Sequence, residues 1–171
     1  FYATLHPFIR NSVGSMEFGG VFMNKFLNRG NNRGQQRLTT DVFQIATGIL
    51  FQNPVQMFAL TPNNLADAPA SLISFMKEIP TTWDETVYID GYPGKFSVIA
   101  RRHGEQWYIA GVNALEQPLE LELNLPMVAG QEVSIYSDNS NREALVTSNK
   151  VNKNGKVTVT LQPKGGFVIK Q

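Results

Sequence analysis

The second half of the sequence alternates apolar and polar residues with a period of two, and this pattern constrains the fold more than any other feature. Residues 119–125 read LELELNL. Successive side chains of a β-strand point to opposite faces of a sheet, so this stretch predicts one face in a core and one in water. Eight segments fit strands: residues 85–91, 96–102, 106–113, 118–125, 131–138, 144–151, 156–162 and 166–170. Short strands at this spacing predict an antiparallel β-sandwich or a barrel.

Two tight turns lie within this half. Residues 102–105 and 153–156 each contain a glycine or asparagine that can adopt positive φ, so we expect the strands on either side of each turn to pair as hairpins. His103 lies in the first turn, and we interpret it as a solvated turn residue. No combination of residues in this half matches a catalytic site.

The first half has a different pattern of predicted secondary structure, in which helix, short strand and helix follow one another. Residues 35–51 predict a mostly buried helix, with Leu38 among the apolar residues of its stripe. Pro54 lies just beyond the helix end, and residues 55–60 predict a short apolar strand. A second helix is expected from Pro69 to Ile79, because proline is tolerated at a first helical position.

The change of predicted secondary-structure pattern near Trp83 indicates a boundary between two domains, residues 1–84 and residues 85–171. An apolar strand between two helices is typical of α/β sheets, whose parallel strands are covered on both faces. One such strand cannot form a sheet, so we expect its neighbours to come from outside this sequence. The first 84 residues also fall far below the ~250 of a closed (β/α)8 barrel, so this α/β unit is expected to be incomplete.

Composition and charge exclude several classes of function. The formal net charge is +1 and cysteine is absent, so neither electrostatic attraction to nucleic acid or anionic lipid nor a thiol-based site is expected. Residues 28–37 are rich in arginine and asparagine but lack interleaved aromatic residues, so we interpret them as a polar loop and not as a nucleic-acid binder. No apolar stretch approaches the ~20 residues that span a bilayer. The chain starts at Phe1 without signal-peptide features, and we expect it to begin within a longer protein.

Few residues are candidates for catalysis or metal binding. His6 and His103 lie in different predicted domains and form no ligand cluster, and His6 precedes what we expect to be a loop at a strand end. Glu17 is the one carboxylate in an apolar, glycine-bounded setting. Glycoside hydrolysis needs two carboxylates that face each other across the scissile bond, and no second one stands near Glu17. We therefore expect no catalytic residue and no metal ligand in this chain.

The order of short motifs resembles one enzyme family. The motifs are PFIRN at residues 7–11, VGSMEF at 13–18, QNPVQMFA at 52–59, IPTTWDET at 79–86, PGKF at 93–96 and IARR at 99–102. In this order they resemble the C-terminal portion of glycoside hydrolase family 97, which contains bacterial α-glucosidases and α-galactosidases. The likeness runs from about Pro7 to about Asn113.

The resemblance implies an α/β plus all-β architecture: the last units of a (β/α)8 catalytic barrel, with residues 55–60 as the eighth strand, followed by a C-terminal antiparallel β-sandwich. It implies hydrolysis of α-linked glucosides or galactosides, with the catalytic carboxylates and the main calcium ligands upstream of Phe1. It also implies a periplasmic or cell-surface location in a Gram-negative bacterium. This chain would supply part of the substrate-pocket rim, with His6, Glu17 and Arg29 as candidates.

Residues 16–20 depart from the family pattern. They read MEFGG where the family usually has Met-Asp-Tyr-Thr-Pro, which lengthens the acid and removes a phenol. We therefore expect an altered pocket rim, with the choice between glucose and galactose and between retention and inversion left open. The chain alone is expected to be inactive, because hydrolysis requires both carboxylates in one geometry. Its expected partners are the glycoside substrate and the upstream part of the same enzyme.

Two alternative functions apply to the sandwich. A separate carbohydrate-binding module would need exposed aromatic side chains on one face, and the candidates are Tyr88, Trp107, Tyr108 and Tyr136. Alternation places Trp107 and Tyr108 on opposite faces, so only part of this set is expected to be exposed. A purely structural sandwich that covers the barrel is ranked above the binding module.

Overall fold

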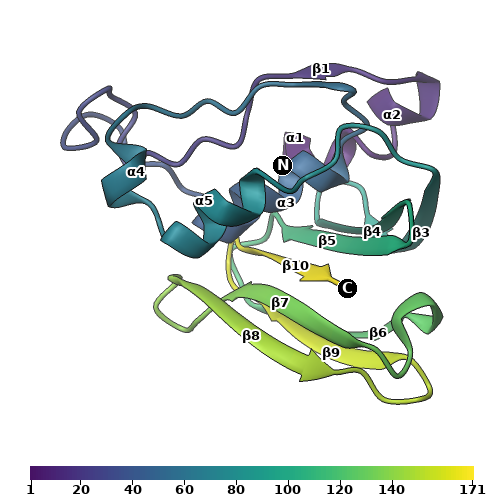
Figure 1. Ribbon diagram of the computed structural model, residues 1–171. Coiled ribbons are helices and arrows are strands. Elements are labelled where there is room, and N and C mark those ends of the chain that lie inside the picture. The colour runs from purple at the N-terminus through teal and green to yellow at the C-terminus, as the bar shows by residue number, and fades with distance from the viewer.

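The computed structural model describes residues 1–171, and its elements are stacked in layers (Figure 1). The helices are α1 (Tyr2–Leu5), α2 (Arg10–Val13), α3 (Asp41–Leu50), α4 (Asn64–Asp67), α5 (Ala70–Met76) and the 3-10 turn η1 (Pro126–Val128). The strands are β1 (Glu17–Phe18), β2 (Val55–Gln56), β3 (Glu85–Tyr92), β4 (Phe96–His103), β5 (Gln106–Asn113), β6 (Leu119–Asn124), β7 (Glu132–Asp138), β8 (Ala144–Lys150), β9 (Lys156–Leu161) and β10 (Gly166–Lys170).

Strands β3 to β10 confirm the antiparallel β-architecture predicted for the second half. Six of them form one sheet in the order β3-β4-β5-β10-β7-β8, and β6 pairs with β9 in a second, two-stranded sheet. Each of the eight predicted strands overlaps one observed strand. The last strand in the sequence, β10, lies inside the large sheet, where it pairs with β5 on one side and with β7 on the other.

The six-stranded sheet is covered on both faces. One face packs against β6 and β9 around residues such as Ile109, Leu123 and Phe167. The other face packs against α3 and α5 around residues such as Ala110 and Val168. Strands β4, β5 and β10 are therefore buried almost throughout, and the expectation of clean alternation is wrong for them. Alternation holds for β6 and β9, whose outer faces lie in water.

Helix α3 is shorter than predicted, because its N-terminal cap lies inside the predicted range. The side-chain hydroxyl of Thr40 accepts the backbone N–H of Phe43 at 3.0 Å, which satisfies one of the free donors of the first turn. Ile45 and Ile49 are fully buried, as the apolar stripe predicts. Leu38 precedes the cap and is 64% exposed, so its predicted place in the stripe is wrong.

Strands β1 and β2 form a two-stranded parallel pair. Glu17 lies opposite Val55 and Phe18 opposite Gln56. The predicted strand at 55–60 is thus regular only over its first two residues, although Met57 N–H still bonds to Phe18 O at 3.1 Å. The expectation that its neighbours come from outside the sequence is wrong for this side, since β1 supplies one neighbour. In Figure 1 the pair lies on the far side of α3 from the six-stranded sheet.

Two further local predictions are wrong. The turn at residues 153–156 has Gly155 at φ 73°, but β8 pairs with β7 and β9 pairs with β6, so this turn carries the chain from one sheet to the other. The turn at residues 102–105 does close the β4–β5 hairpin. His6 directly follows α1, between two short helices, and not a strand.

One core continues across the predicted domain boundary. Trp83 packs against the helix-side core, and Arg101 of β4 is 2% exposed and donates from Nη2 to the carbonyl oxygen of Leu50 at 3.2 Å. A cation at the C-terminus of α3 is favourable, although burial lowers the pKa of Arg101 to about 10. The helices and the sandwich thus share a core, and the division at residue 84 stays a prediction.

None of the helices is both long enough and apolar enough to cross a bilayer.

Candidate functional site

The loops that follow β1 and β2 meet at one edge of the parallel pair. Because the two strands run in the same direction, both end at this edge. The chain after β1 makes a long excursion over residues 19–40 before α3, and the chain after β2 runs over residues 57–69, including α4, before α5. Ligands of α/β folds bind outside the carboxyl ends of parallel strands. This edge is therefore the candidate functional site.

Asn24 joins the two loops. Its side chain is 1% exposed, and its Oδ1 accepts hydrogen bonds from Nδ2 of Asn64 at 2.6 Å and from Nδ2 of Asn63 at 3.1 Å. Its Nδ2 donates to the carbonyl oxygen of Asn28 at 2.8 Å. A buried amide is costly unless it is paired, so these bonds favour a single relative position of the two loops.

A second link between the loops involves Asp67. Its Oδ2 accepts from Nδ2 of Asn63 at 2.7 Å and from Nδ2 of Asn31 at 3.3 Å. The bond from Asn63 and then the bond from Asn31 hold the pKa of Asp67 below its ordinary value, because both stabilise the carboxylate. Asp67 is therefore charged at neutral pH and stays an acceptor.

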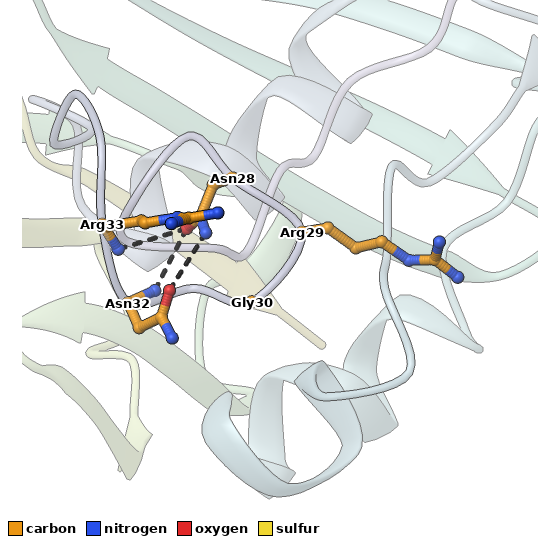
Figure 2. Close-up of a pocket in the computed structure, with 5 residues that line it drawn as sticks. All are labelled: Asn28, Arg29, Gly30, Asn32 and Arg33. Atoms are coloured by element: carbon orange, nitrogen blue, oxygen red, sulfur yellow. Dashed lines mark hydrogen bonds between the residues drawn. The ribbon is translucent and has the colours of Figure 1, made fainter.

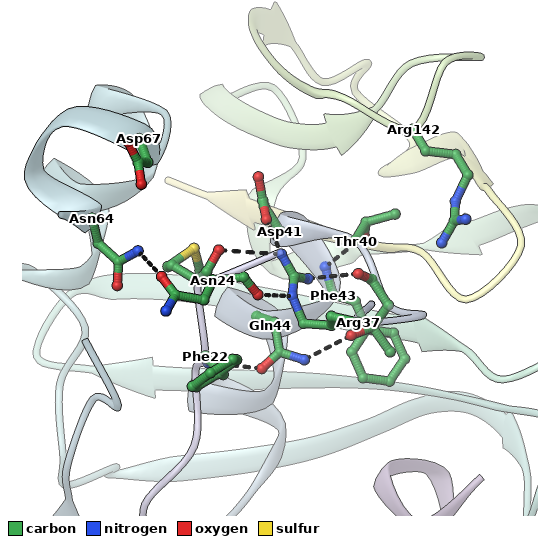
Figure 3. A network of polar contacts seen from close by, with 12 residues as sticks. Phe22, Asn24, Arg37, Thr40, Asp41, Phe43, Gln44, Asn64, Asp67 and Arg142 are labelled. Atoms are coloured by element: carbon green, nitrogen blue, oxygen red, sulfur yellow. Dashed lines mark hydrogen bonds and ion pairs between the residues drawn. The ribbon is translucent and has the colours of Figure 1, made fainter. Parts of the chain in front are cut away.

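The first turns of α3 hold the base of the longer loop (Figure 3). Gln44 accepts the N–H of Phe22 through Oε1 at 2.9 Å and donates from Nε2 to Oγ1 of Thr39 at 2.8 Å. Arg37 forms an ion pair with Asp41 in the first turn of the helix. Both ends of the loop are thus tied to one helix.

The loop tip, residues 28–34, is organised by asparagine side chains (Figure 2). Asn28 Oδ1 accepts the backbone N–H groups of Asn32 and Arg33 at 3.1 and 3.3 Å, and Asn28 Nδ2 donates to Asn32 Oδ1 at 3.0 Å. A polar cavity of about 440 Å³ lies here, lined by Asn28, Arg29, Gly30, Asn32 and Arg33. Neither arginine forms an ion pair within the chain. Their guanidinium groups are available to hydroxyl or carboxylate acceptors.

The three predicted rim residues lie in different places. Arg29 lies on the loop tip and points away from the other labelled residues of the tip in Figure 2. Glu17 lies on β1 itself, with its side chain exposed. His6 lies beside Phe51, a residue that shortly precedes β2, and the two ring centroids are 5.3 Å apart. The structure does not bring these residues together within this chain, and their roles stay a prediction.

The two faces of the parallel pair differ, and this difference orients Glu17. Phe18 packs against the helix-side core and makes an edge-on contact with Phe51 at 4.7 Å between ring centroids. Since neighbouring residues of a strand point to opposite faces, Glu17 points away from α3. Val55 and Met57 share its face and are 60% and 68% exposed. The outer face of the pair is thus apolar, carries one carboxylate and is uncovered in this chain.

A second uncovered apolar surface surrounds His6. A groove of about 540 Å³ lies along α1 and α2 and is lined by Tyr2, Leu5, His6, Ile9, Arg10 and Val13. Contiguous exposed apolar surface of this kind usually marks a contact site. His6 therefore lies in an exposed, largely apolar groove, whereas Arg29 lies in the loop that follows β1.

The residues of this edge that the sequence did not single out are Asn24, Asn63 and Asp67. Asparagine is a common turn residue, and nothing in the local pattern indicates that Asn24 meets Asn64, 40 positions later. The one available signal is the number of asparagines in both loops. Their pairing follows from the parallel strands and could be inferred only once β1 was recognised.

Metal binding by this chain alone finds no support in its side-chain arrangement. No three histidine, aspartate or glutamate side chains come together as a set of ligands. A hard cation such as calcium takes six to eight oxygen ligands, so the residues present do not fit the calcium ion that the resemblance implies.

A family model matches more than half of the chain. Residues 82–170 match the model described as Glycosyl-hydrolase 97 C-terminal, oligomerisation. This range takes in all eight strands of the sandwich together with Trp83.

A curated relative and two solved structures resemble nearly the whole chain. A retaining alpha-galactosidase from Bacteroides thetaiotaomicron is 31% identical over 180 residues, which cover 99% of this chain and 27% of the relative. A beta-arabinopyranosidase crystal structure is 57% identical with a TM-score of 0.96, covering 99% of this chain and 27% of that chain. A glycoside hydrolase family 97 enzyme from Pseudoalteromonas sp., solved with acarbose, is 26% identical with a TM-score of 0.83 and covers 98% of this chain and 28% of that chain.

This chain spans about a quarter of the length of these relatives. The structural matches include both the sandwich and the first half, since nearly all of this chain superposes. The matched family model, the fold and the relatives agree, and the chain belongs to glycoside hydrolase family 97, of which it represents the C-terminal part.

Proposed function

We propose that this chain is the C-terminal part of a glycoside hydrolase that acts on sugars of the galacto configuration, α-galactosides and β-arabinopyranosides. The observation that carries the proposal is the 57% identity to a beta-arabinopyranosidase over 99% of this chain. A β-L-arabinopyranoside has the ring configuration of an α-D-galactopyranoside and lacks only the hydroxymethyl group. The retaining alpha-galactosidase similar to this chain and the beta-arabinopyranosidase therefore need pockets that differ little.

In this proposal β1 and β2 are the last two strands of a (β/α)8 barrel, α3 lies between them in sequence, and α5 is the final helix. The parallel pairing of β1 and β2 supports this arrangement, and so does the exposed apolar face with Val55 and Met57, because inward-facing residues of such barrels pack against other strands. Glu17 then points into the barrel. The loops at residues 19–40 and 57–69 then belong to the rim of the substrate pocket.

The catalytic carboxylates of the proposed enzyme lie in the rest of the protein, and so do the ligands of the calcium ion expected from the family. Both classes of residue would be expected at the carboxyl ends of other barrel strands. The groove along α1 and α2 supports a contact with that remaining part, since its apolar residues are uncovered here. A periplasmic or cell-surface location belongs to the same proposal.

The test uses the full-length enzyme that contains this chain. Its rates on nitrophenyl α-galactoside, β-L-arabinopyranoside and α-glucoside are compared with those of Glu17→Asp and of Glu120→Asp, an equally conservative change on the water-facing side of β6. We expect the two galacto-configured substrates to be preferred and Glu17→Asp to change the ratio of their kcat/KM values, because a shorter acid leaves room at the pocket wall. A preference for α-glucoside would contradict the proposed substrate class. An unchanged ratio in Glu17→Asp would remove Glu17 from the pocket.

A second function, self-association through the sandwich, is favoured by the description of the matched family model and by the edges of the large sheet. Edge strand β3 is interrupted by a bulge between Tyr88 and Asp90, and the ring of Phe8 lies 5.9 Å from that of Tyr88. Edge strand β8 pairs with β7 without interruption and exposes Leu145 and Val146. An unprotected edge is a ready site for pairing with another strand.

Light scattering on the full-length enzyme tests this second function. Val146→Lys places a charge on the β8 edge and is expected to shift an oligomer toward monomer, whereas Tyr92→Lys at the opposite edge of the sheet leaves the mass unchanged. Equal masses for both variants and the unmodified enzyme would exclude pairing through β8.

A separate carbohydrate-binding role has less support, because Tyr108 and Tyr136 pack under α5 against Phe75 and offer no aromatic platform.

A further inference from the structure

The end of β7 and the loop after it reach across to the loop that precedes α3. We call residues 138–143 the β7 clasp. Asp138, the last residue of β7, is buried, and its Oδ2 accepts from Oγ1 of Thr40 at 2.8 Å and from the N–H of Gly166 at 2.9 Å. One carboxylate oxygen therefore ties three segments: the helix cap, the start of β10 and the end of β7. The backbone adds a bond from Thr40 N–H to the carbonyl oxygen of Lys164 at 3.2 Å.

The second contact of the clasp comes from Arg142. Its guanidinium donates to the carbonyl oxygen of Leu38, two residues before the helix cap. Figure 3 shows Arg142 approaching this region from a segment separate from the loop that it contacts. Leu38 and Thr40 flank Thr39, whose hydroxyl accepts from Gln44. The clasp thus holds the returning end of the loop on both sides of the residue that binds α3.

Hydrogen bonds within the clasp organise its loop. The side-chain Oδ1 of Asn139 accepts the N–H groups of Asn141 and Glu143 at 2.9 and 3.0 Å, and Asn139 Nδ2 donates to Glu143 Oε2 at 3.1 Å. Arg142 has φ 63°, in the left-handed region that non-glycine residues seldom occupy. Such a backbone conformation persists when the surroundings determine it, and here it aims the Arg142 side chain at the loop.

A polar cavity marks the junction of the clasp with both loops of the carboxyl edge. It measures about 460 Å³, and its charged lining residues are Lys25, Arg37, Asp41, Asp67, Arg142 and Glu143. They come from the longer loop, the start of α3, the shorter loop and the clasp. The sandwich therefore borders the same edge as the arginine-bearing loop tip.

We propose that Asp138 and Arg142 are positioning residues through which the sandwich fixes the loop at residues 22–39, and with it Arg29, at the substrate pocket. This inference rests on the proposed function, in which that loop belongs to the pocket rim. Beyond α3 the loop is held by Asn24 on its outgoing end, by the bond from Asn31 to Asp67 at its tip and by the clasp on its returning end. Removal of one anchor leaves the tip attached but able to move. A rim that contacts the substrate in the ground state and in the transition state alike then changes KM more than kcat.

Arg142→Ala in the full-length enzyme is the principal variant, with Arg142→Lys as the conservative one and Lys150→Ala on β8 as the control. Hydrogen exchange of residues 25–37 and the kinetics on the nitrophenyl glycoside that the enzyme cleaves fastest are measured for each. We expect Arg142→Ala to accelerate exchange in this segment and to raise KM about 3-fold to 10-fold with kcat within about 2-fold. Arg142→Lys recovers part of both effects, because its ammonium can still donate to the Leu38 carbonyl. Lys150→Ala changes neither.

Three outcomes would overturn the inference, and each identifies the step that fails. Unchanged exchange in Arg142→Ala shows that the clasp does not hold the loop. Faster exchange with an unchanged KM shows that the clasp holds a loop that plays no part in substrate binding. If both kcat and the temperature of unfolding fall in Arg142→Ala, and Arg142→Lys recovers neither, the substitution causes a general loss of structure. An enzyme that cleaves none of the glycosides instead refutes the proposed function, and the exchange data then decide the clasp by themselves.

Discussion

The two faces of the six-stranded sheet are completed in different ways. Between this sheet and the β6–β9 pair, the core is made only from residues of the second half, with Leu123, Leu161 and Phe167 among its fully buried members. On the opposite face, the core combines both halves, and beyond its helices lies the parallel pair with Met57 exposed on its outer face. One face ends in water after a closed core, and the other ends in an uncovered apolar surface.

The outer surfaces on the two sides of the sheet differ in polarity. Strands β6 and β9 carry charged and polar residues on their outer faces, so no further layer is needed there. The helix side offers Val55, Met57 and the groove along α1 and α2, which additional chain would cover. The β6–β9 side of the sandwich therefore has a polar outer face, and the helix side has an apolar outer face that further protein would cover.

The largest expected effect is in the closed core. Leu123→Ala removes a side chain that is 1% exposed and is expected to lower the free energy of unfolding by about 3 to 4 kcal/mol, the sum of lost burial and a residual cavity. Urea denaturation measures it. Leu145→Ala, on the exposed edge of β8, is the matched control, with an expected loss of at most about 0.5 kcal/mol. Similar losses for both variants would show that the inter-sheet core is loosely packed.

The junction between the two halves should depend on pH through Asp138. Burial, only partly opposed by the bonds from Gly166 and Thr40, raises the pKa of Asp138 from 3.8 to about 6. The folded chain then keeps a proton that the unfolded chain loses between pH 4 and 6, so stability falls as pH rises through this window. We expect a loss on the order of 2 to 3 kcal/mol from this group.

The difference in unfolding free energy between the unmodified chain and Asp138→Asn, measured at several pH values from 4 to 7.5, isolates this contribution. Other titrating groups cancel in the difference. The unmodified chain should lose stability relative to the variant as pH rises through about 6. Parallel pH profiles would mean that water reaches Asp138 and that the junction is more open than its burial indicates.

A smaller effect is expected at the cap of α3. Thr40→Ala removes the acceptor for Phe43 N–H and the donor to Asp138, and should cost about 1 to 2 kcal/mol. Thr40→Ser keeps the hydroxyl and should retain most of that stability. Thermal unfolding of the three proteins provides the comparison. Equal losses for alanine and serine would assign the effect to the methyl group and not to the cap.

The smallest effect is expected on the uncovered face. Met57→Ser changes a side chain that is 68% exposed and should alter the unfolding free energy of this chain by less than about 0.5 kcal/mol. In the full-length enzyme the same substitution should be several times more costly, because the proposed barrel covers this face. Equal small effects in both proteins would remove the support that Met57 gives to the barrel.

The sandwich strands were readable from the sequence because their signals are local. Alternation in residues 119–124 and the glycine of the turn at residues 102–105 both act over a few positions. The covering of the second face was missed, although β5 and β10 contain apolar runs that are typical of strands buried on both sides. These apolar runs indicate burial on both faces, which a general expectation of alternation does not accommodate.

The candidate site was less readable, because its contacts join residues far apart in the chain. The interpretation of residues 28–37 as a polar loop is confirmed, since arginine and asparagine without apolar neighbours indicate exposure. The bond from Thr40 to Asp138 spans 98 positions and that from Arg142 to Leu38 spans 104. No periodicity encodes such pairs. Strand β1 was also missed, because two residues are too few to produce a pattern.

The central place of β10 has a consequence for how the sheet is assembled. Ala110 of β5 pairs with Val168 of β10, and Val168 in turn pairs with Tyr136 of β7, so the two halves of the sheet are joined only by the strand that comes last in the sequence. Until β10 pairs with them, β5 and β7 each expose an unpaired edge. The β5–β10 and β7–β10 pairings close long loops and therefore form slowly. During synthesis and refolding the most aggregation-prone surfaces of this chain are therefore the ones that are best hidden when it is finished.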